Sequence, residues 1–125
     1  MRALVLTAVI ALAACNRLPR DSSAREQAMA MTGADPDDGP PLMRHYGCVS
    51  CHTIPGVQGA DATVGPPLTA MARRTFIAGV LPNTPTNMVR WIVNPPAVDS
   101  LTAMPYLGVT AADARRMAAY LYTLK

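Results

Sequence analysis

Residues 54–67 form a segment rich in glycine and proline that has neither helical nor strand periodicity, so the segment is predicted to be a loop. Loops of this length are uncommon in small compact domains and usually need something to organise them. The chain also offers few large side chains for a core, because half of its 125 residues are apolar but only 5% are aromatic. We therefore expect a single small domain whose loops are organised by a large bound group.

Residues 48–52 have the spacing C-x-x-C-H and indicate what this group is. The spacing is the attachment signature of c-type haem. Two thiols that lie two residues apart on a helical turn, Cys48 and Cys51, can each form a thioether with a vinyl group of the porphyrin. The adjacent His52 then lies beneath the iron, and a neutral imidazole nitrogen suits iron in either oxidation state. The motif therefore predicts one covalently bound haem c.

Three other kinds of site that these residues could form fit the sequence less well than haem. A thioredoxin-like C-x-x-C site requires a strand–helix–strand setting, which the sequence does not predict. A zinc site requires four ligands, and only His45 is available to join Cys48, Cys51 and His52. A structural disulfide between the two cysteines would be strained and would leave His52 without a role. The odd total of three cysteines also disfavours a framework made of disulfides alone.

Two short helices are predicted from their start and stop signals. The first starts at Pro40 or Pro41, where a missing N–H costs nothing, and ends at Gly47. The second follows the N-cap Thr84 and ends at the Asn-Pro-Pro run 94–96. Its apolar face comprises Met88, Trp91 and Ile92.

The last helix is predicted from an approximate capping box, in which Asp113 follows Thr110 at the third position. It is expected to run to about Leu124, and a single helical turn is expected within 68–74. No alternating strand pattern and no internal repeat occurs in the sequence. The predicted fold class is all-α, with three to four short helices around the haem. The apolar stripe of the last helix comprises Ala114, Met117, Ala118 and Leu121.

The first residues resemble a bacterial export signal. Residues 3–14 are apolar apart from one threonine and are too few to span a bilayer, which takes roughly 20 apolar residues. Residues 12–15, Leu-Ala-Ala-Cys, resemble the lipobox of bacterial lipoproteins, in which cleavage precedes a cysteine that receives a diacylglycerol. A plain signal peptide with a free Cys15 is the alternative. The expected division is a lipoprotein signal peptide at 1–14, a flexible tether at 15–39 and a folded domain at 40–125.

Charge and anchoring limit the partners that we expect. The net charge of +3 is small and no basic run exceeds two residues, so a nucleic-acid partner is not expected. A lipidated Cys15 would anchor the domain to a bacterial membrane on its periplasmic side. Asn16 leaves the choice between the inner and the outer membrane open.

From about Pro40 to Lys125, roughly the last two thirds of the sequence, the chain resembles small monohaem cytochromes c with His and Met axial ligands. The resemblance rests on four motifs in order, and it implies that the carbonyl of Pro66 accepts a hydrogen bond from His52 and fixes its ring. These motifs are residues 48–52, the Gly-Pro-Pro-Leu run 65–68, residues 94–95 with 102–105, and Tyr120 with Leu121 in the last helix.

The resemblance also assigns the distal ligand and the haem pocket. Met104 lies in a loop between two helices and is followed by Pro105, as in the family, so it is the expected second ligand of the iron. His45 is only seven residues from His52 and is not expected to reach the opposite face of the haem. The pocket is expected to be lined by Cys48, Cys51, His52, Leu68, Trp91 and Met104.

Two further residue types are candidates for the haem carboxylates. Asn83 and one of Arg73 or Arg74 are expected to bind a propionate, since the guanidinium forms a rigid fork of donors. Solvated surface arginine is the plain alternative.

Haem iron with both axial positions filled by protein leaves one-electron transfer as its chemistry, so the expected function is a carrier rather than an enzyme. The expected protein is a monomer that meets redox donors and acceptors at the membrane. Two alternatives stay open. One is a labile distal ligand, so that the iron binds a diatomic gas or acts on peroxide, and the other is a fixed cytochrome subunit of a larger complex.

Overall fold

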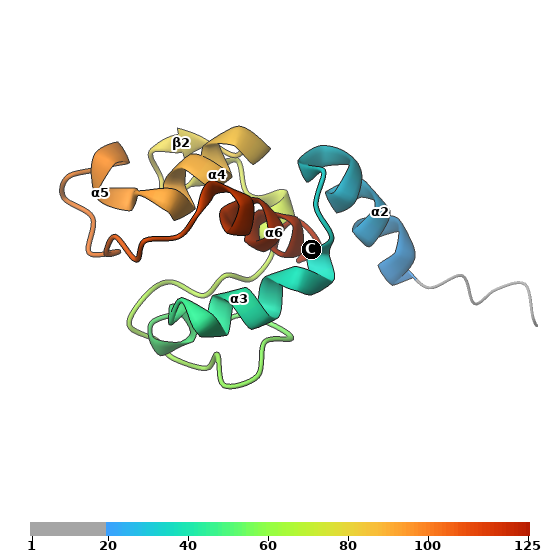
Figure 1. The fold of residues 1–125 in the computed structure, drawn as a ribbon, viewed down its shortest axis with the longest axis horizontal. Helices are drawn as coiled ribbons and strands as arrows, with labels where there is room; N and C mark the ends of the chain where they lie inside the picture. Colours follow the sequence, from blue (N-terminus) through green and yellow to red (C-terminus); the bar gives the residue numbers. More distant parts are fainter. Residues whose placement is uncertain (1–19) are drawn as a thin grey trace, which may run out of the picture.

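The structure, a computed structural model, describes residues 20–125, and this part of the chain is mostly helical with one short two-stranded sheet (Figure 1). Its α-helices are α2 (Arg20–Thr32), α3 (Gly39–His45), α4 (Pro85–Val93), α5 (Pro95–Val98) and α6 (Ala111–Leu121). Short 3-10 turns occur at η2 (Pro36–Asp38), η3 (Cys48–Ser50) and η4 (Met71–Arg73). The strands are β1 (Phe76–Ile77) and β2 (Leu81–Pro82).

Helix α6 lies at the centre of the fold and contacts α2, α3 and α4 (Figure 1). The predicted cap is confirmed, because Oγ1 of Thr110 accepts the N–H of Asp113 at 3.1 Å. The helix ends at Leu121 rather than near Leu124, since Thr123 turns back and its Oγ1 donates to a carbonyl of α6 at 2.6 Å. The predicted apolar stripe is buried to at least 96%: Ala114, Met117, Ala118 and Leu121 are at most 4% exposed.

The two other predicted helices are confirmed as α3 and α4. Oγ1 of Thr84 accepts the N–H of Asn87 at 3.2 Å and caps α4. Helix α3 starts at Gly39, one residue before the predicted position, and is followed by Gly47 at φ 78°, a conformation that glycine adopts without strain. The buried face of α4 is the predicted one: Met88, Trp91 and Ile92.

The connections agree with the sequence in part. Residues 54–67 form a loop as predicted, and Oη of Tyr120 holds it by donating to the carbonyl of Pro55 at 2.6 Å. The single turn expected within 68–74 is η4. Helix α5 was not predicted, and Oδ1 of Asn94 caps it by accepting the N–H of Ala97 at 3.2 Å.

The pair of strands is a departure from the all-α prediction. Strands β1 and β2 are antiparallel, with Phe76 opposite Pro82 and Ile77 opposite Leu81. Ala78 in the turn between them has φ 51°. Each strand has two residues, which is too short for an alternation of apolar and polar positions to be recognisable in the sequence.

Residues 20–39 differ from the flexible tether expected for 15–39. Helix α2 packs on α6, and its residues Ala24, Ala28 and Thr32 are at most 8% exposed. Alanine and threonine give little hydrophobic contrast along a helix, so this face was not recognised from periodicity. Within the described residues the folded unit therefore starts near Arg20. The signal peptide, Cys15 and the remainder of the expected tether lie outside the described residues.

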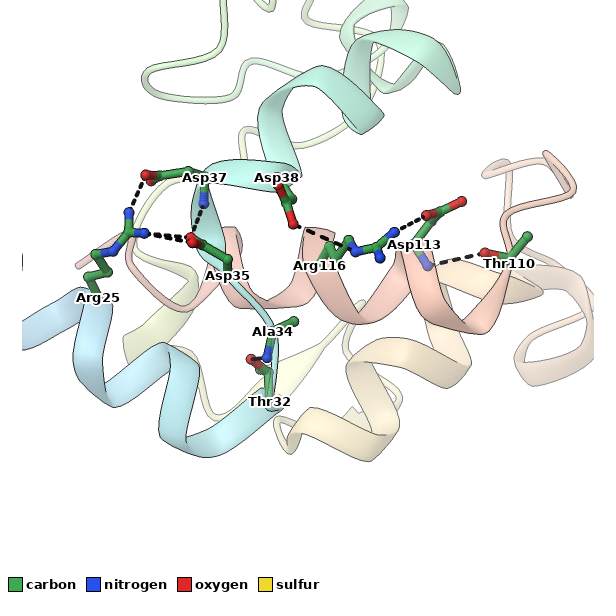
Figure 2. A network of polar contacts seen from close by, with 9 residues as sticks. All are labelled: Arg25, Thr32, Ala34, Asp35, Asp37, Asp38, Thr110, Asp113 and Arg116. Atoms are coloured by element: carbon green, nitrogen blue, oxygen red, sulfur yellow. Dashed lines mark hydrogen bonds and ion pairs between the residues drawn. The ribbon is translucent and has the colours of Figure 1, made fainter.

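A polar network connects the end of this segment to both α2 and α6 (Figure 2). Arg25 of α2 donates to both carboxylate oxygens of Asp35, at 2.7 and 2.8 Å, and pairs with Asp37. Arg116 of α6 pairs with Asp38 at 3.7 Å and with Asp113 at 3.0 Å. These groups are partly exposed, so the pairs set the position of the segment more than they stabilise it.

Candidate functional site

A partly open cavity of about 600 Å³ lies between the loops and the helices α4 and α6. This volume lies within the range of roughly 300–1,000 Å³ that is typical of ligand sites, and most of the lining side chains are apolar. The prediction of its lining is confirmed. The six residues expected there all line it: Cys48, Cys51, His52, Leu68, Trp91 and Met104.

The two cysteines lie on the wall of the cavity at either end of η3. Gly47 precedes the turn in a left-handed conformation, and its carbonyl accepts Oγ of Ser50 at 2.6 Å, which tightens the turn. Cys48 and Cys51 are half-buried free thiols. Burial raises the pKa of the Cys48 thiol, so it is protonated at neutral pH. The arrangement presents two unoxidised sulfur atoms to one cavity.

His52 is oriented by the carbonyl of Pro66, which lies 2.7 Å from Nδ1. A carbonyl oxygen only accepts, so Nδ1 carries the proton, and in the neutral ring Nε2 is the nitrogen with the free lone pair. The bond predicted from the Gly-Pro-Pro-Leu run is therefore present. Two backbone bonds hold the same run against the motif: Gly65 N–H to the Cys51 carbonyl at 2.6 Å and Leu68 N–H to the Thr53 carbonyl at 2.8 Å.

Gly65 is required by the closeness of the imidazole. A Cβ added at this position would lie 2.5 Å from Cε1 of His52 and 2.8 Å from Nδ1. No substituent fits there unless the ring or the backbone moves. The glycine of the run thus lets the backbone lie directly against the ring.

Met104 lines the cavity from the loop between α5 and α6, and Oγ1 of Thr102 accepts its backbone N–H at 3.1 Å. Sequence reasoning missed that four other methionines line the same cavity. Each of these four belongs to a helix or helical turn and is at most 4% exposed, whereas Met104 is half-buried. They are Met43, Met71, Met88 and Met117.

Asn83 does not reach the cavity. Its Nδ2 donates to the carbonyls of Met71 and Arg74, both at 2.8 Å, and its Oδ1 accepts Oη of Tyr122 at 2.8 Å. Burial raises the pKa of Tyr122 to about 12, so its phenol is a neutral donor at physiological pH. The hydrogen bonds of Asn83 thus connect the backbone around η4 to the residue that follows α6.

Of the two candidate arginines, Arg74 lines the cavity and Arg73 does not. The guanidinium of Arg74 donates to the carbonyl of Pro67 at 2.6 Å and to that of Thr69 at 2.9 Å. Trp91 is 8% exposed and lines the cavity from α4, so it serves as the core anchor of that helix as well.

The described part of the chain holds few of the groups that the alternatives to haem require. No group of three or more His, Cys, Asp and Glu side chains able to hold a metal ion occurs among residues 20–125. His45 is exposed and packs edge-on against Tyr46, with ring centroids 5.0 Å apart, and it does not line the cavity.

None of the helices between Arg20 and Lys125 is long and apolar enough to cross a bilayer.

The residues on the cavity wall fit a covalently held haem. Two free thiols with the required spacing, an imidazole with a free Nε2 and a thioether in a loop meet in one cavity. The walls are mostly apolar, as a porphyrin requires, and the guanidinium of Arg74 is among the lining groups.

Comparison with known proteins gives one relative. The chain is similar to cytochrome c oxidase subunit 2 of Alkalihalophilus pseudofirmus, with 31% identity over 90 residues. The match takes in 71% of this chain, which spans only a quarter of the length of that relative. No model of a known protein family matches, and no solved structure matches. The similarity relates the chain to a protein of redox metabolism.

Proposed function

We propose that the chain is a one-electron carrier that uses a single haem c, attached through Cys48 and Cys51 and ligated by His52 and Met104. The observation that carries this proposal is the meeting of all four side chains at one apolar cavity of about 600 Å³. When bound, a haem with two protein ligands supplies one-electron transfer, and it leaves no open position for a substrate.

Several residues of this chain hold such a group, each in a different way. The thiols of Cys48 and Cys51 attach it covalently. The carbonyl of Pro66 keeps the proton on Nδ1 of His52, so that Nε2 is the free ligand atom. The apolar walls, Leu68 and Trp91 among them, exclude water, which together with thioether ligation favours a relatively high reduction potential.

Met104 is the proposed distal ligand among the five methionines of the cavity. The other four lie in helices or a helical turn and are almost fully buried, so their packing role accounts for them. Met104 lies in a loop, is half-buried and has its backbone fixed by Thr102. A thioether placed in this way is free to serve as a ligand.

The proposed location is the periplasmic side of a bacterial membrane. Its basis is the apolar segment 3–14 followed by Leu-Ala-Ala-Cys, which implies a lipid on Cys15. Tethering to the membrane would raise the effective concentration of the carrier near membrane-bound donors and acceptors. The similarity to an oxidase subunit supports partners in respiratory electron transfer.

The same similarity favours a second candidate, a cytochrome domain held permanently in an oxidase complex. Exposed apolar side chains near the cavity support it, since Val64, Phe76 and Leu107 line the cavity and are 83%, 53% and 39% exposed. Co-purification of the matured chain with oxidase subunits after mild membrane extraction would favour this candidate over a free carrier.

Absorption spectra of the matured protein test the proposed ligand set. We expect a sulfur-to-iron band in the ferric form and little response of the ferrous form to carbon monoxide. Met104→Ala should abolish the band and open the iron to carbon monoxide, and Met71→Ala, which alters another methionine of the same cavity, should keep it. Prompt carbon monoxide binding by the wild type would refute ligation by Met104 and favour a gas or peroxide function. Absence of covalent haem would refute the function itself.

A further inference from the structure

The turn that orients His52 is itself held by one side chain. Arg74 donates from Nη2 to the Pro67 carbonyl at 2.6 Å and to the Thr69 carbonyl at 2.9 Å, and from Nε to the latter at 3.2 Å. Pro67 directly follows Pro66, whose carbonyl accepts the Nδ1 proton of His52. The guanidinium therefore fixes the backbone on the C-terminal side of the carbonyl that sets the ring.

The backbone of Arg74 is in turn held by Asn83 and Tyr122. Its backbone carbonyl accepts Nδ2 of Asn83 at 2.8 Å, and Oδ1 of Asn83 accepts Oη of Tyr122 at 2.8 Å. Tyr122 is 5% exposed and stays a neutral donor. A backbone bond from Ala72 to the carbonyl of Leu124, at 2.9 Å, joins the same two segments. The end of α6 thus anchors the segment that carries the arginine.

We propose that Arg74 is a positioning residue for His52, acting through the carbonyls of the Pro66–Thr69 turn, and that Asn83 and Tyr122 hold it in place. The inference rests on the proposed function, because it takes His52 as the ligand of the haem iron. A fork of guanidinium donors can reach two carbonyls at once, which a single ammonium on a flexible stem does not reproduce. Groups that orient a ligating histidine in this way control the metal site without touching the metal.

The test measures how fast the Nδ1 proton of His52 exchanges with solvent, by NMR on the matured, haem-loaded full-length chain. Arg74→Lys keeps the charge and removes the fork, and we expect exchange to be about fivefold faster than in the wild type, the factor that corresponds to the loss of one hydrogen bond. Arg73→Lys is the matched control, because Arg73 is adjacent, exposed and absent from the cavity wall. It should leave the rate unchanged. Tyr122→Phe should raise the rate by a smaller factor.

The exchange protection of two backbone amides distinguishes a positioning role of Arg74 from a general loosening of the turn. The amide protons of Gly65 and Leu68 bond to the carbonyls of Cys51 and Thr53 and not to Arg74, so they should stay protected in Arg74→Lys. An unchanged His52 rate in Arg74→Lys, or joint loss of protection at His52 and these two amides, would overturn the inference. If Arg74→Lys does not mature, an unchanged rate in Tyr122→Phe overturns it instead. A wild-type chain without haem refutes the proposed function and removes the basis of the inference, whereas haem-loaded variants with unchanged rates refute only the inference.

Discussion

The backbone of Gly65 lies directly against the imidazole of His52, and Gly65→Ala is therefore a direct perturbation of this ring. The added Cβ would lie 2.5 Å from Cε1, 2.8 Å from Nδ1 and 3.1 Å from Nε2. The first two distances are too short for carbon against a ring atom, and the third is tight. Because the backbone of Gly65 is bonded to the Cys51 carbonyl at 2.6 Å, we expect the ring to move rather than the main chain.

The expected cost has two parts. Overpacking a close contact destabilises a fold by about 1–3 kcal/mol. Displacing the ring also breaks its bond to the Pro66 carbonyl, which contributes about 1 kcal/mol. We therefore expect the free energy of unfolding to fall by about 2–4 kcal/mol. In the proposed haem protein, the ligand field at the iron should change at the same time.

Denaturant unfolding of the matured protein measures the free energy of unfolding. Its visible and NMR spectra report the ligand field at the iron. Gly39→Ala is the matched control, since its Cβ would meet Cβ of Tyr120 at 2.5 Å, away from the cavity. It should destabilise the protein to a similar degree and leave the spectra of the haem unchanged. Equal spectra for Gly65→Ala and the wild type, or equal spectral changes in both variants, would refute the reasoning.

Three further predictions concern the helices around the site. Thr110→Ala removes the cap of α6 and should lower the free energy of unfolding by about 1 kcal/mol in urea titrations. The hydrogen bond from Tyr46 is the main cause of the lowered pKa of Asp113. The carboxylate therefore stabilises the fold at pH values above its ordinary pKa of 3.8, and this stabilisation is lost as the pH falls through the lower pKa of the folded state. In Tyr46→Phe the urea midpoint should depend less steeply on pH in that acid range. Arg25→Ala removes the pairs with Asp35 and Asp37, and hydrogen exchange should accelerate in α2 but not at Gly65; equal rates in α2 would contradict this role.

The sequence predicted those elements whose boundaries are set by local side-chain chemistry. Thr84 and Thr110 each cap a helix through one hydroxyl, and both helices start where these residues place them. The bond from His52 to Pro66 joins residues 14 positions apart and follows from the resemblance. The cavity lining followed from the same motifs, which lie at the turn η3 and in two loops, together with Trp91 of α4.

What could not be predicted depends on tertiary contacts. Helix α2 packs through Ala24 and Ala28, which do not stand out as an apolar face in the sequence. Asn83 was expected at a propionate, but its amide is used by two backbone carbonyls that only the folded chain brings near. The four methionines beside Met104 come from four separate elements, so no spacing in the sequence reveals that they share a cavity.

The central place of α6 has a consequence for the order of events during folding. This helix is encoded near the end of the chain, yet it contacts α2, α3 and α4 and supplies Met117 and Leu121 to the cavity. Contacts between residues so far apart form late, after the chain that connects them is available. Until α6 docks, the wall that Met117 and Leu121 supply is absent from the cavity that Cys48 and Cys51 line. The interval before docking is therefore when an enzyme would have free access to both thiols.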